Sequence, residues 1–270
     1  KISLMVPRLA LSLCLMTANQ AVAQIDSTTV HYYVGKAVRA HPDGAVGAAS
    51  FHGSLQYQFV TKPPNVPVVD IQKFNASLGW VAHPSVNFMG SFRGISEDSS
   101  RYELAFGLRL YTVNPERKDK AHNPDGPVGG PVLTASGGIR YSDLAVEDAK
   151  TIGDFTLLVP VSRRLSILAG MRLFEAIEQA DVQQAYGGLN FYLSPYNADS
   201  AYTNPDGQVG NAAFHLSGGG SENGVFGDLT MFFPISNKLT WHITLRGERV
   251  ELPYRRVVAI GGGFSLYPSN

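Results

Sequence analysis

Hydrophobic and polar residues alternate along most of the chain beyond residue 50. In the first such segment, Leu55, Tyr57 and Phe59 are separated by serine and glutamine. Segments 74–80, 86–93, 102–110 and 239–246 follow the same period of two. That period places successive side chains on opposite faces of a β-strand, whereas a helix would repeat its apolar positions every 3.6 residues. The pattern predicts an all-β protein with four strands between residues 54 and 110.

A seven-residue motif recurs three times and divides the chain into similar units. It reads HPDGAVG at 41–47, NPDGPVG at 123–129 and NPDGQVG at 204–210, at intervals of 82 and 81 residues. Two other markers keep the same order: a turn (VPVSRRL at 159–165, FPISNKL at 233–239 and the shorter His83-Pro84-Ser85) and a strand ending in tyrosine (GLRLY at 107–111, GLNFY at 188–192, GFSLY at 263–267). We therefore expect three tandem four-strand repeats, about 41–122, 123–203 and 204–270, and about twelve strands in all.

The composition of the two strand faces leaves two architectures open. One face is aromatic and aliphatic, and the other carries mainly Gly, Ser, Thr and Asn. A soluble sandwich buries its apolar face, whereas a membrane barrel turns that face toward lipid. Three features favour the barrel: strands of about 9–11 residues, tyrosines near the strand ends, and polar faces that contain little lysine. The tyrosines expected in a lipid-boundary girdle are Tyr102, Tyr111, Tyr141, Tyr192 and Tyr267.

The N-terminus has the three parts of a secretory signal peptide. Lys1 and Arg8 flank an apolar run at 9–16, and an A-x-A site ends at Ala23. We expect residues 1–23 to be removed and 24–47 to lead into a barrel at 48–270. Cys14, the single cysteine, would leave with the signal peptide, so disulfides are not expected. Lys plus Arg equal Asp plus Glu at 22 each, which gives no indication of a nucleic-acid partner.

From about residue 54 to 267 the chain resembles a bacterial outer-membrane β-barrel of the porin-like class. The resemblance lies in amphipathic strands joined by short Pro-x-Ser-x-Arg/Lys-Leu turns, which look like the periplasmic hairpins of that class. It implies a closed antiparallel transmembrane barrel surrounded by outer-membrane lipid. Such barrels commonly end on an aromatic residue, whereas Pro268, Ser269 and Asn270 follow the last tyrosine here. Two soluble sandwich domains remain an alternative, and a β-trefoil fits less well because its units are about half as long.

The repeated motif, called the corner below, has the composition of a β-turn. Asn or His stands first, Pro second and Gly fourth, as a type I turn prefers. We expect each corner to join two repeats, on the periplasmic side if the N-terminus is periplasmic, although periplasmic connections are usually shorter. A cation or partner site is the alternative, but calcium loops need several carboxylates and each corner has one. The corner residues concerned are Asp43, Gly44, Asp125, Gly126, Asp206 and Gly207.

Charged residues recur on the faces expected to point into the lumen. Arginine occupies the same place in the third strand of each unit, and aspartate occupies the second strand of the last two units. Adjacent strands would bring Asp154 near Arg172 and Asp228 near Arg246. These charges are expected either to pair structurally or to form a constriction that selects ions. The lumen candidates are Arg93, Arg172, Arg246, Asp154, Asp228, Glu103, Arg109, Asn190 and His242.

The chain contains little that indicates catalysis. There is no G-x-S-x-G, H-E-x-x-H or P-loop motif, and the histidines show no metal-ligand spacing. His52 with Ser54 and His215 with Ser217 form weak nucleophile–base candidates. We therefore expect no cofactor, metal or catalytic residue, and predict a narrow channel for small polar or anionic solutes. A non-conducting interaction platform and a lipid-modifying barrel enzyme are the alternatives, and the oligomeric state is not predicted.

Overall fold

A computed structural model describes residues 41–61, 69–96, 100–115, 119–142, 150–174, 182–197, 203–221, 224–251 and 254–268. The expected signal peptide and the segment up to residue 40 lie outside these residues. No helix among the described residues is long and apolar enough to cross a bilayer.

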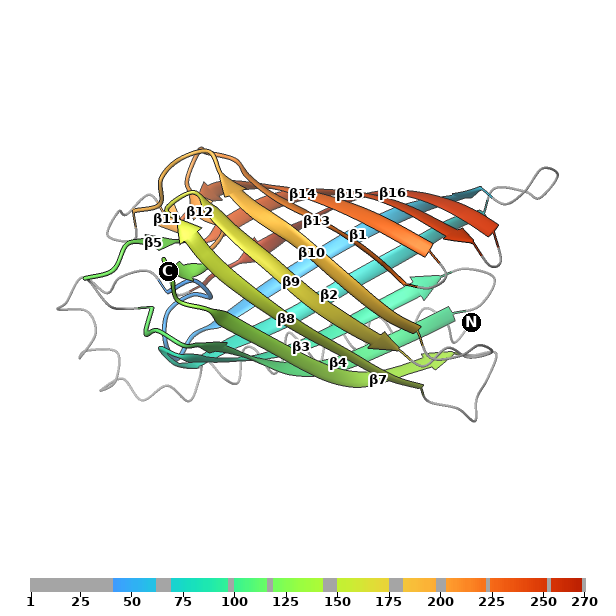
Figure 1. Ribbon diagram of the computed structural model, residues 1–270, viewed down its shortest axis with the longest axis horizontal. Coiled ribbons are helices and arrows are strands. Elements are labelled where there is room, and N and C mark those ends of the chain that lie inside the picture. Colours follow the sequence, from blue (N-terminus) through green and yellow to red (C-terminus); the bar gives the residue numbers. More distant parts are fainter. Residues whose placement is uncertain are drawn as a thin grey trace. The chain divides into compact units, whose positions relative to one another are not determined.

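Twelve long strands form one closed antiparallel barrel, which confirms the fold class expected from the sequence (Figure 1). Each strand pairs with its sequence neighbour, and β1 closes the barrel by pairing with β16 from Phe51–Leu266 to Thr61–Arg256. The barrel strands are β1 (Ala49–Thr61), β2 (Val69–His83), β3 (Val86–Ser96), β4 (Ser100–Tyr111), β7 (Val132–Ser142), β8 (Lys150–Ser162), β9 (Leu165–Phe174), β10 (Val182–Tyr192), β13 (Ala213–Ser221), β14 (Gly224–Ser236), β15 (Leu239–Glu251) and β16 (Tyr254–Leu266).

The barrel is apolar outside and polar inside. Phe106, Trp241 and Val258 are 66%, 63% and 63% exposed on the outer face, whereas Asn190 and Glu103 are 3% and 6% exposed. A soluble protein rarely exposes so continuous an apolar surface, and a closed barrel leaves no unpaired edge in lipid. The barrel therefore spans a membrane, and the soluble-sandwich alternative is wrong. Its strands of 9 to 15 residues extend beyond the expected 9–11, and they tilt strongly (Figure 1).

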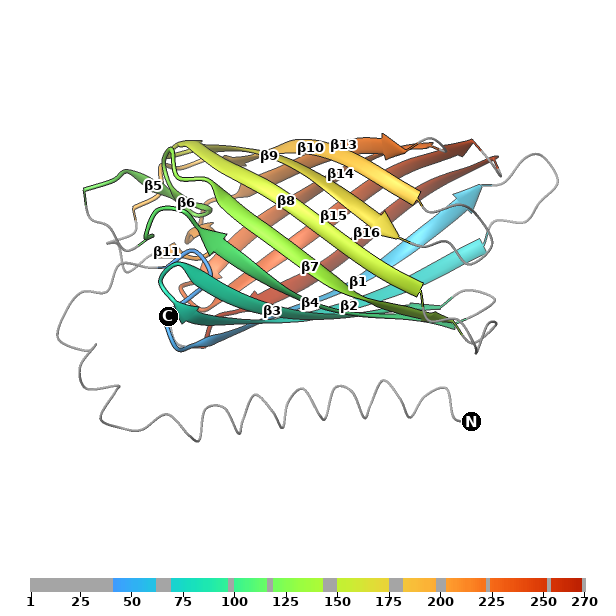
Figure 2. The same ribbon diagram turned by 60° about the horizontal axis from the view of Figure 1, so that its bottom comes forward.

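All three corners lie at one end of the barrel, called the corner end (Figure 2). Four short strands belong to two of them: β5 (His122–Asn123) pairs with β6 (Gly126–Pro127), and β11 (Thr203–Asn204) pairs with β12 (Gly207–Gln208). The tight turns β2–β3, β8–β9 and β14–β15 lie at the same end, and each follows a register shift at the same point of its hairpin. Such a β-bulge tolerates Pro160 and Pro234, which cannot donate to a regular strand pair.

Three of the five expected girdle tyrosines face inward, so their assignment to the lipid boundary is wrong. Tyr111, Tyr192 and Tyr267 are 4%, 4% and 3% exposed, whereas Tyr141 is 39% exposed. The alternation itself explains the correction, because Tyr111 lies two residues after Arg109 and shares its inward face. Their hydroxyl groups contact the corners, as shown below.

Tyr186 crosses the inner wall over Gly170, and this contact requires a glycine. A Cβ added at Gly170 would lie 2.3 Å from the Tyr186 ring and 2.7 Å from the Phe155 carbonyl oxygen. We expect Gly170→Ala to lower the free energy of unfolding by about 1–3 kcal/mol, the usual cost of overpacking. Urea unfolding in lipid vesicles measures the change. Gly247→Ala, whose Cβ would meet nothing within 4 Å, should be close to wild type, and equal losses in both variants would contradict the explanation.

Candidate functional site

Each corner is followed by a group of four barrel strands, β1–β4, β7–β10 or β13–β16, which we call its four-strand group. The first residue of each corner attaches it to the tight turn of that group. The Asn123 side chain accepts a hydrogen bond from the Asp125 backbone N–H at 2.9 Å. Its amide nitrogen donates to the Ser162 carbonyl at 2.9 Å, the Leu165 carbonyl at 3.2 Å and the Ser166 hydroxyl at 2.8 Å. Asn204 makes the corresponding contacts with Asp206, Ser236, Leu239 and Thr240. One asparagine therefore both shapes the corner and attaches it to the barrel wall.

His41 fills the place of asparagine in the first corner. Its Nδ1 atom accepts from the Asp43 backbone N–H at 3.1 Å, and its Nε2–H donates to the Pro84 carbonyl at 3.0 Å. The two ring nitrogens thus supply the one acceptor and one donor that the asparagine amide supplies elsewhere. Burial lowers the pKa of His41, so the neutral ring that this arrangement needs is favoured.

The corner glycines adopt the backbone conformation that favours glycine. Gly44, Gly126 and Gly207 have φ angles of 107°, 139° and 144°, a region that side chains with a Cβ rarely enter. The backbone N–H of the last corner residue then donates to the wall at 2.7–2.9 Å: Gly47 to Val81, Gly129 to Pro160 and Gly210 to Pro234. The corners are turns, as expected, but they fold over the barrel mouth.

Replacing a corner asparagine should loosen this end of the barrel. We expect Asn204→Ala to lower the free energy of unfolding by about 1–3 kcal/mol, because two carbonyls and one hydroxyl lose their donor. Thermal unfolding followed by the mobility shift of the folded barrel on gels measures it. His41→Asn should cost less than about 1 kcal/mol, because asparagine serves in the other two corners. A loss as large as that of Asn204→Ala would contradict this equivalence.

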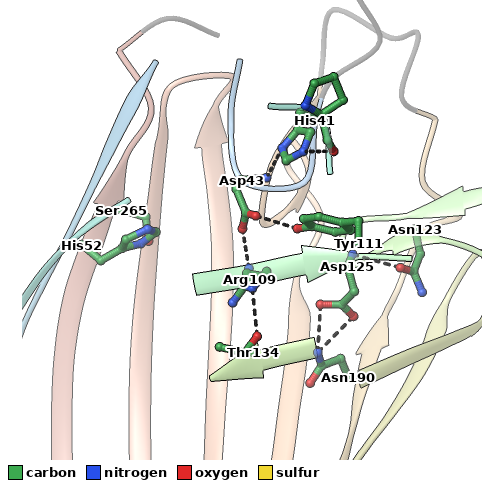
Figure 3. Close-up of polar contacts among 11 residues, drawn as sticks. His41, Asp43, His52, Arg109, Tyr111, Asn123, Asp125, Thr134, Asn190 and Ser265 are labelled. Carbon is green, nitrogen blue, oxygen red and sulfur yellow. Dashed lines mark hydrogen bonds and ion pairs between the residues drawn. The ribbon is translucent and has the colours of Figure 1, made fainter. Parts of the chain in front are cut away.

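The three corner aspartates line the lumen and meet the strand-end tyrosines. Figure 3 shows Asp43 with Tyr111 and Arg109, and Asp125 with Asn190. Asp43 accepts from the Tyr111 hydroxyl at 2.6 Å and forms an ion pair with Arg109. Asp125 accepts from the Asn190 amide at 3.0 Å through both oxygens and from the Tyr192 hydroxyl. Asp206 accepts from Thr240 and Tyr267. The three corners thus share one geometry, but among the described residues only the first corner's carboxylate forms an ion pair.

The different partners give two of these carboxylates opposite acidities. Burial would raise the pKa of Asp43, but the Arg109 guanidinium, His41 and the Tyr111 hydroxyl together hold it below the usual value. Burial also raises the pKa of Asp206, and there the hydrogen bonds from Thr240 and Tyr267 do not offset it. The first corner therefore carries a stabilised negative charge, and the third carries one that burial disfavours.

A second layer of charge crosses the lumen farther from the corners, and we call it the charged belt. Arg172 contacts Asp154 at 2.9 Å and Arg246 contacts Asp228 at 2.8 Å, the two pairs expected from strand register. Arg93 and Arg140 contact Glu103 at 3.0 and 2.7 Å, and Glu248 contacts Arg246 at 3.1 Å. Lys73 lies close enough to interact with Arg93, Arg246, Glu103 and Glu248. The described belt thus contains four arginines and four carboxylates, and Lys73 adds a fifth cation when it is protonated.

A cavity of about 590 Å³ fills the lumen toward the corner end. Its lining includes the Pro-Asp pair of each corner: Pro42 and Asp43, Pro124 and Asp125, Pro205 and Asp206. Arg109, Asn190, His52 and His215 also line it. The neighbouring His242 packs its ring 5.6 Å from that of Phe232, facing inward as expected. The corners therefore narrow the lumen at this end and bound a space large enough for a small solute.

The structure does not pair His52 with Ser54, the first of the two weak Ser–His candidates. The hydroxyl of Ser54 accepts from Asn75 at 3.1 Å, while His52 contacts Ser265 at 2.9 Å (Figure 3). Ser265 is 1% exposed, so its hydroxyl is inaccessible to a substrate. Among the described residues, no group of three or more His, Cys, Asp or Glu could hold a metal ion.

Several residues of both charged layers were not among the sequence candidates. Arg140, Glu248 and Lys73 complete the charged belt, and the inward tyrosines complete the corners. Alternation alone places Arg140 and Glu248 on the inner face, as it does the tyrosines. Arg140 and Glu248 do not recur at equivalent places in the three units, so the repeat gave no signal for them, whereas the tyrosines do recur and were assigned to the lipid boundary.

Comparison with known proteins shows similarity in architecture only. No family model matches the chain, and no curated protein matches it. Similar solved structures include the KdgM porin (6% identity, TM-score 0.45, 79% of this chain and 98% of that chain) and the NanC porin (6% identity, TM-score 0.47, 78% and 98%). The translocator domain of the autotransporter NalP from Neisseria meningitidis is also similar (8% identity, TM-score 0.46, 93% and 97%). These structures assign the chain no solute.

Proposed function

We propose that the protein is a narrow channel of the bacterial outer membrane for small polar solutes. The observation that carries this proposal is a polar, charge-lined lumen with a cavity of about 590 Å³ inside a closed twelve-stranded barrel. Side chains fill the interior of an eight-stranded barrel, and open porins have sixteen to eighteen strands. A twelve-stranded barrel lies between these two classes. The apolar exterior supports contact with outer-membrane lipid, and the corner end, where β1 begins and β16 ends, would face the periplasm.

The charged belt supports a weak preference for anionic solutes. Arg93, Arg172 and Arg246 occupy the third of the four strands that follow each corner, and Lys73, when protonated, gives the described belt one cation more than its carboxylates. Most of the arginine charge is neutralised by direct pairing at 2.7–3.1 Å. The preference for anions would therefore be smaller than three unpaired arginines would produce.

One observation favours a second function, a barrel that does not conduct and acts through its loops. Three corners fold over the same mouth and narrow it. In this alternative they would close it, and the barrel would serve as a structural or interaction platform. The Ser–His geometry offers no such support for a lipid-modifying enzyme.

Single-channel recording of the refolded barrel in a planar bilayer tests the proposal. A channel should give discrete current steps, and a salt gradient should give a reversal potential displaced slightly toward anions. A protein that folds, as shown by its heat-modifiable gel mobility, but gives no steps would support the platform function. Protein that remains soluble without detergent would overturn the membrane assignment.

A further inference from the structure

The corner-end cavity is built differently from the charged belt, because its carboxylates exceed its cations. Asp43 is neutralised by Arg109. Asp125 and Asp206 form no ion pair with a lysine or arginine in the described part of the chain, since every ion pair found there involves other residues. Arg109 also interacts electrostatically with Asp125. With histidines neutral, the lining residues Asp43, Asp125, Asp206 and Arg109 thus carry a formal net charge of −2.

The hydrogen-bonding atoms left over in this cavity are acceptors. Asn190 donates its amide N–H groups to Asp125, which leaves its Oδ1 atom buried and, within the described residues, without a partner. Asp206 Oδ2 and Asn87 Oδ1 are likewise buried and have no hydrogen-bond partner among the described residues. All three residues line the cavity, and Asn190 and Asn87 are 3% and 2% exposed. A buried acceptor without a donor costs about 1–3 kcal/mol. Each of these three atoms has less than 1 Å² of accessible surface, so a ligand rich in N–H groups would satisfy them once their side chains turn toward the cavity.

From this arrangement we infer that the corner-end cavity binds a small organic cation with primary ammonium groups, such as a linear diamine. Each ammonium group brings one positive charge and three N–H donors, which match the uncompensated carboxylates and the free acceptors. The proline rings of the three corners, with Leu158, Leu168 and Phe232, supply an apolar surface for an alkyl chain between two such groups. The volume of about 590 Å³ lies within the range of small-molecule sites.

The spacing of the carboxylates favours an organic cation over a metal ion. The three aspartates come from three separate corners, and each is held by the tyrosine of its own four-strand group. The described residues include no group of three or more potential metal ligands. A compact divalent ion needs several oxygens at 2.0–2.6 Å, whereas a flexible diamine can reach carboxylates that lie apart.

The energetics of Asp206 are consistent with a ligand that supplies its missing cation. A buried carboxylate without a positive partner lowers stability, and the first corner shows that an arginine fits at the equivalent of Ser265. Positions that lower stability in the empty protein are common in binding sites. The inference rests on the proposed function in one respect, that the solute enters through the lumen.

Calorimetric titration of the full-length refolded barrel in a non-ionic detergent with 1,4-diaminobutane tests the inference. The diamine should bind, and 1,4-butanediol, which has the same length but no charge, should bind at least tenfold more weakly. Asp125→Asn with Asp206→Asn should weaken diamine binding at least tenfold, because asparagine keeps the shape and removes both charges. Asp119→Asn removes the same charge from an exposed position of the β4–β7 connection and should leave binding unchanged.

Either of two results with the wild-type barrel would overturn the inference: equal binding of diamine and diol, or no diamine binding in the millimolar range. Diamine binding that survives both substitutions would do the same. The wild-type comparison decides the matter even if the double variant fails to fold. Conductance separates this inference from the proposed function. A barrel that conducts but does not bind the diamine would refute only the cation site. A barrel that binds the diamine but does not conduct would refute only the channel.

Discussion

Replacing Arg172 and Arg246 together by alanine should shift the channel's reversal potential toward cation preference. Each arginine neutralises an aspartate on the adjacent strand, Asp154 at 2.9 Å and Asp228 at 2.8 Å. Their removal leaves these carboxylates, and Glu248 beside them, facing the lumen without their nearest cation. Inside a narrow pore the uncompensated charges attract cations and repel anions. A tenfold gradient of a monovalent salt measures the shift, for which full selectivity sets a limit of about 59 mV.

The reverse substitutions provide the sharper test. Asp154→Asn with Asp228→Asn should move the reversal potential toward anions, because Arg172 then loses its compensating charge and Arg246 keeps only Glu248. Arg163→Ala with Arg164→Ala serves as the control: it removes two positive charges from the exposed β8–β9 turn, outside the lumen. The control should stay near wild type, because salt screens exposed charges beyond about 10 Å. Identical reversal potentials in all four proteins would show that the charged belt does not set selectivity.

The predictions from sequence succeeded wherever a residue's place along its strand determines the face it occupies and the residues beside it. Alternation located the strands and their inward faces, and matching positions in successive strands gave the Asp154–Arg172 and Asp228–Arg246 pairs. Both depend only on the period of a strand and the register of a hairpin. The same rule would have placed Tyr111 inside, but a tyrosine near a strand end was assigned to the lipid boundary by residue type.

The role of the corners could not be predicted, because local turn chemistry does not fix the direction in which a turn points. Asn, Pro, Asp and Gly specify a reversal, and the same residues would suit a turn projecting into solvent. The inward direction depends on the carbonyls of Ser162 and Leu165, which are about forty residues from Asn123 in the chain. It also depends on tyrosines at the ends of distant strands. Only the closed barrel brings these groups together.

The aspartates of the first and third corners should respond to the same substitution with opposite signs. At pH 7, Asp43→Asn should lower the free energy of unfolding by about 2 kcal/mol, because Arg109 loses its anionic partner in a largely buried setting. Asp206→Asn should raise it by about 1 kcal/mol, because it removes a buried charge that no cation offsets. Urea unfolding in lipid vesicles measures both, followed by the fluorescence of Trp80 and Trp241, which are 51% and 63% exposed on the outer face.

The pH dependence of stability distinguishes this explanation from a general effect of amides in a turn. The pKa of Asp43 is lowered by folding, so its contribution is present above the unfolded value of about 3.8 and is lost as pH falls through the folded value. The pKa of Asp206 is raised, so its contribution is present below that unfolded value and is lost as pH rises through the folded value. Asp43→Asn should therefore reduce the loss of stability in acid, and Asp206→Asn should reduce the loss that follows as pH rises above about 4. Shifts of the same sign in both variants would show that the three corners are electrostatically equivalent, and Arg109 would then have no special role at the mouth of the barrel.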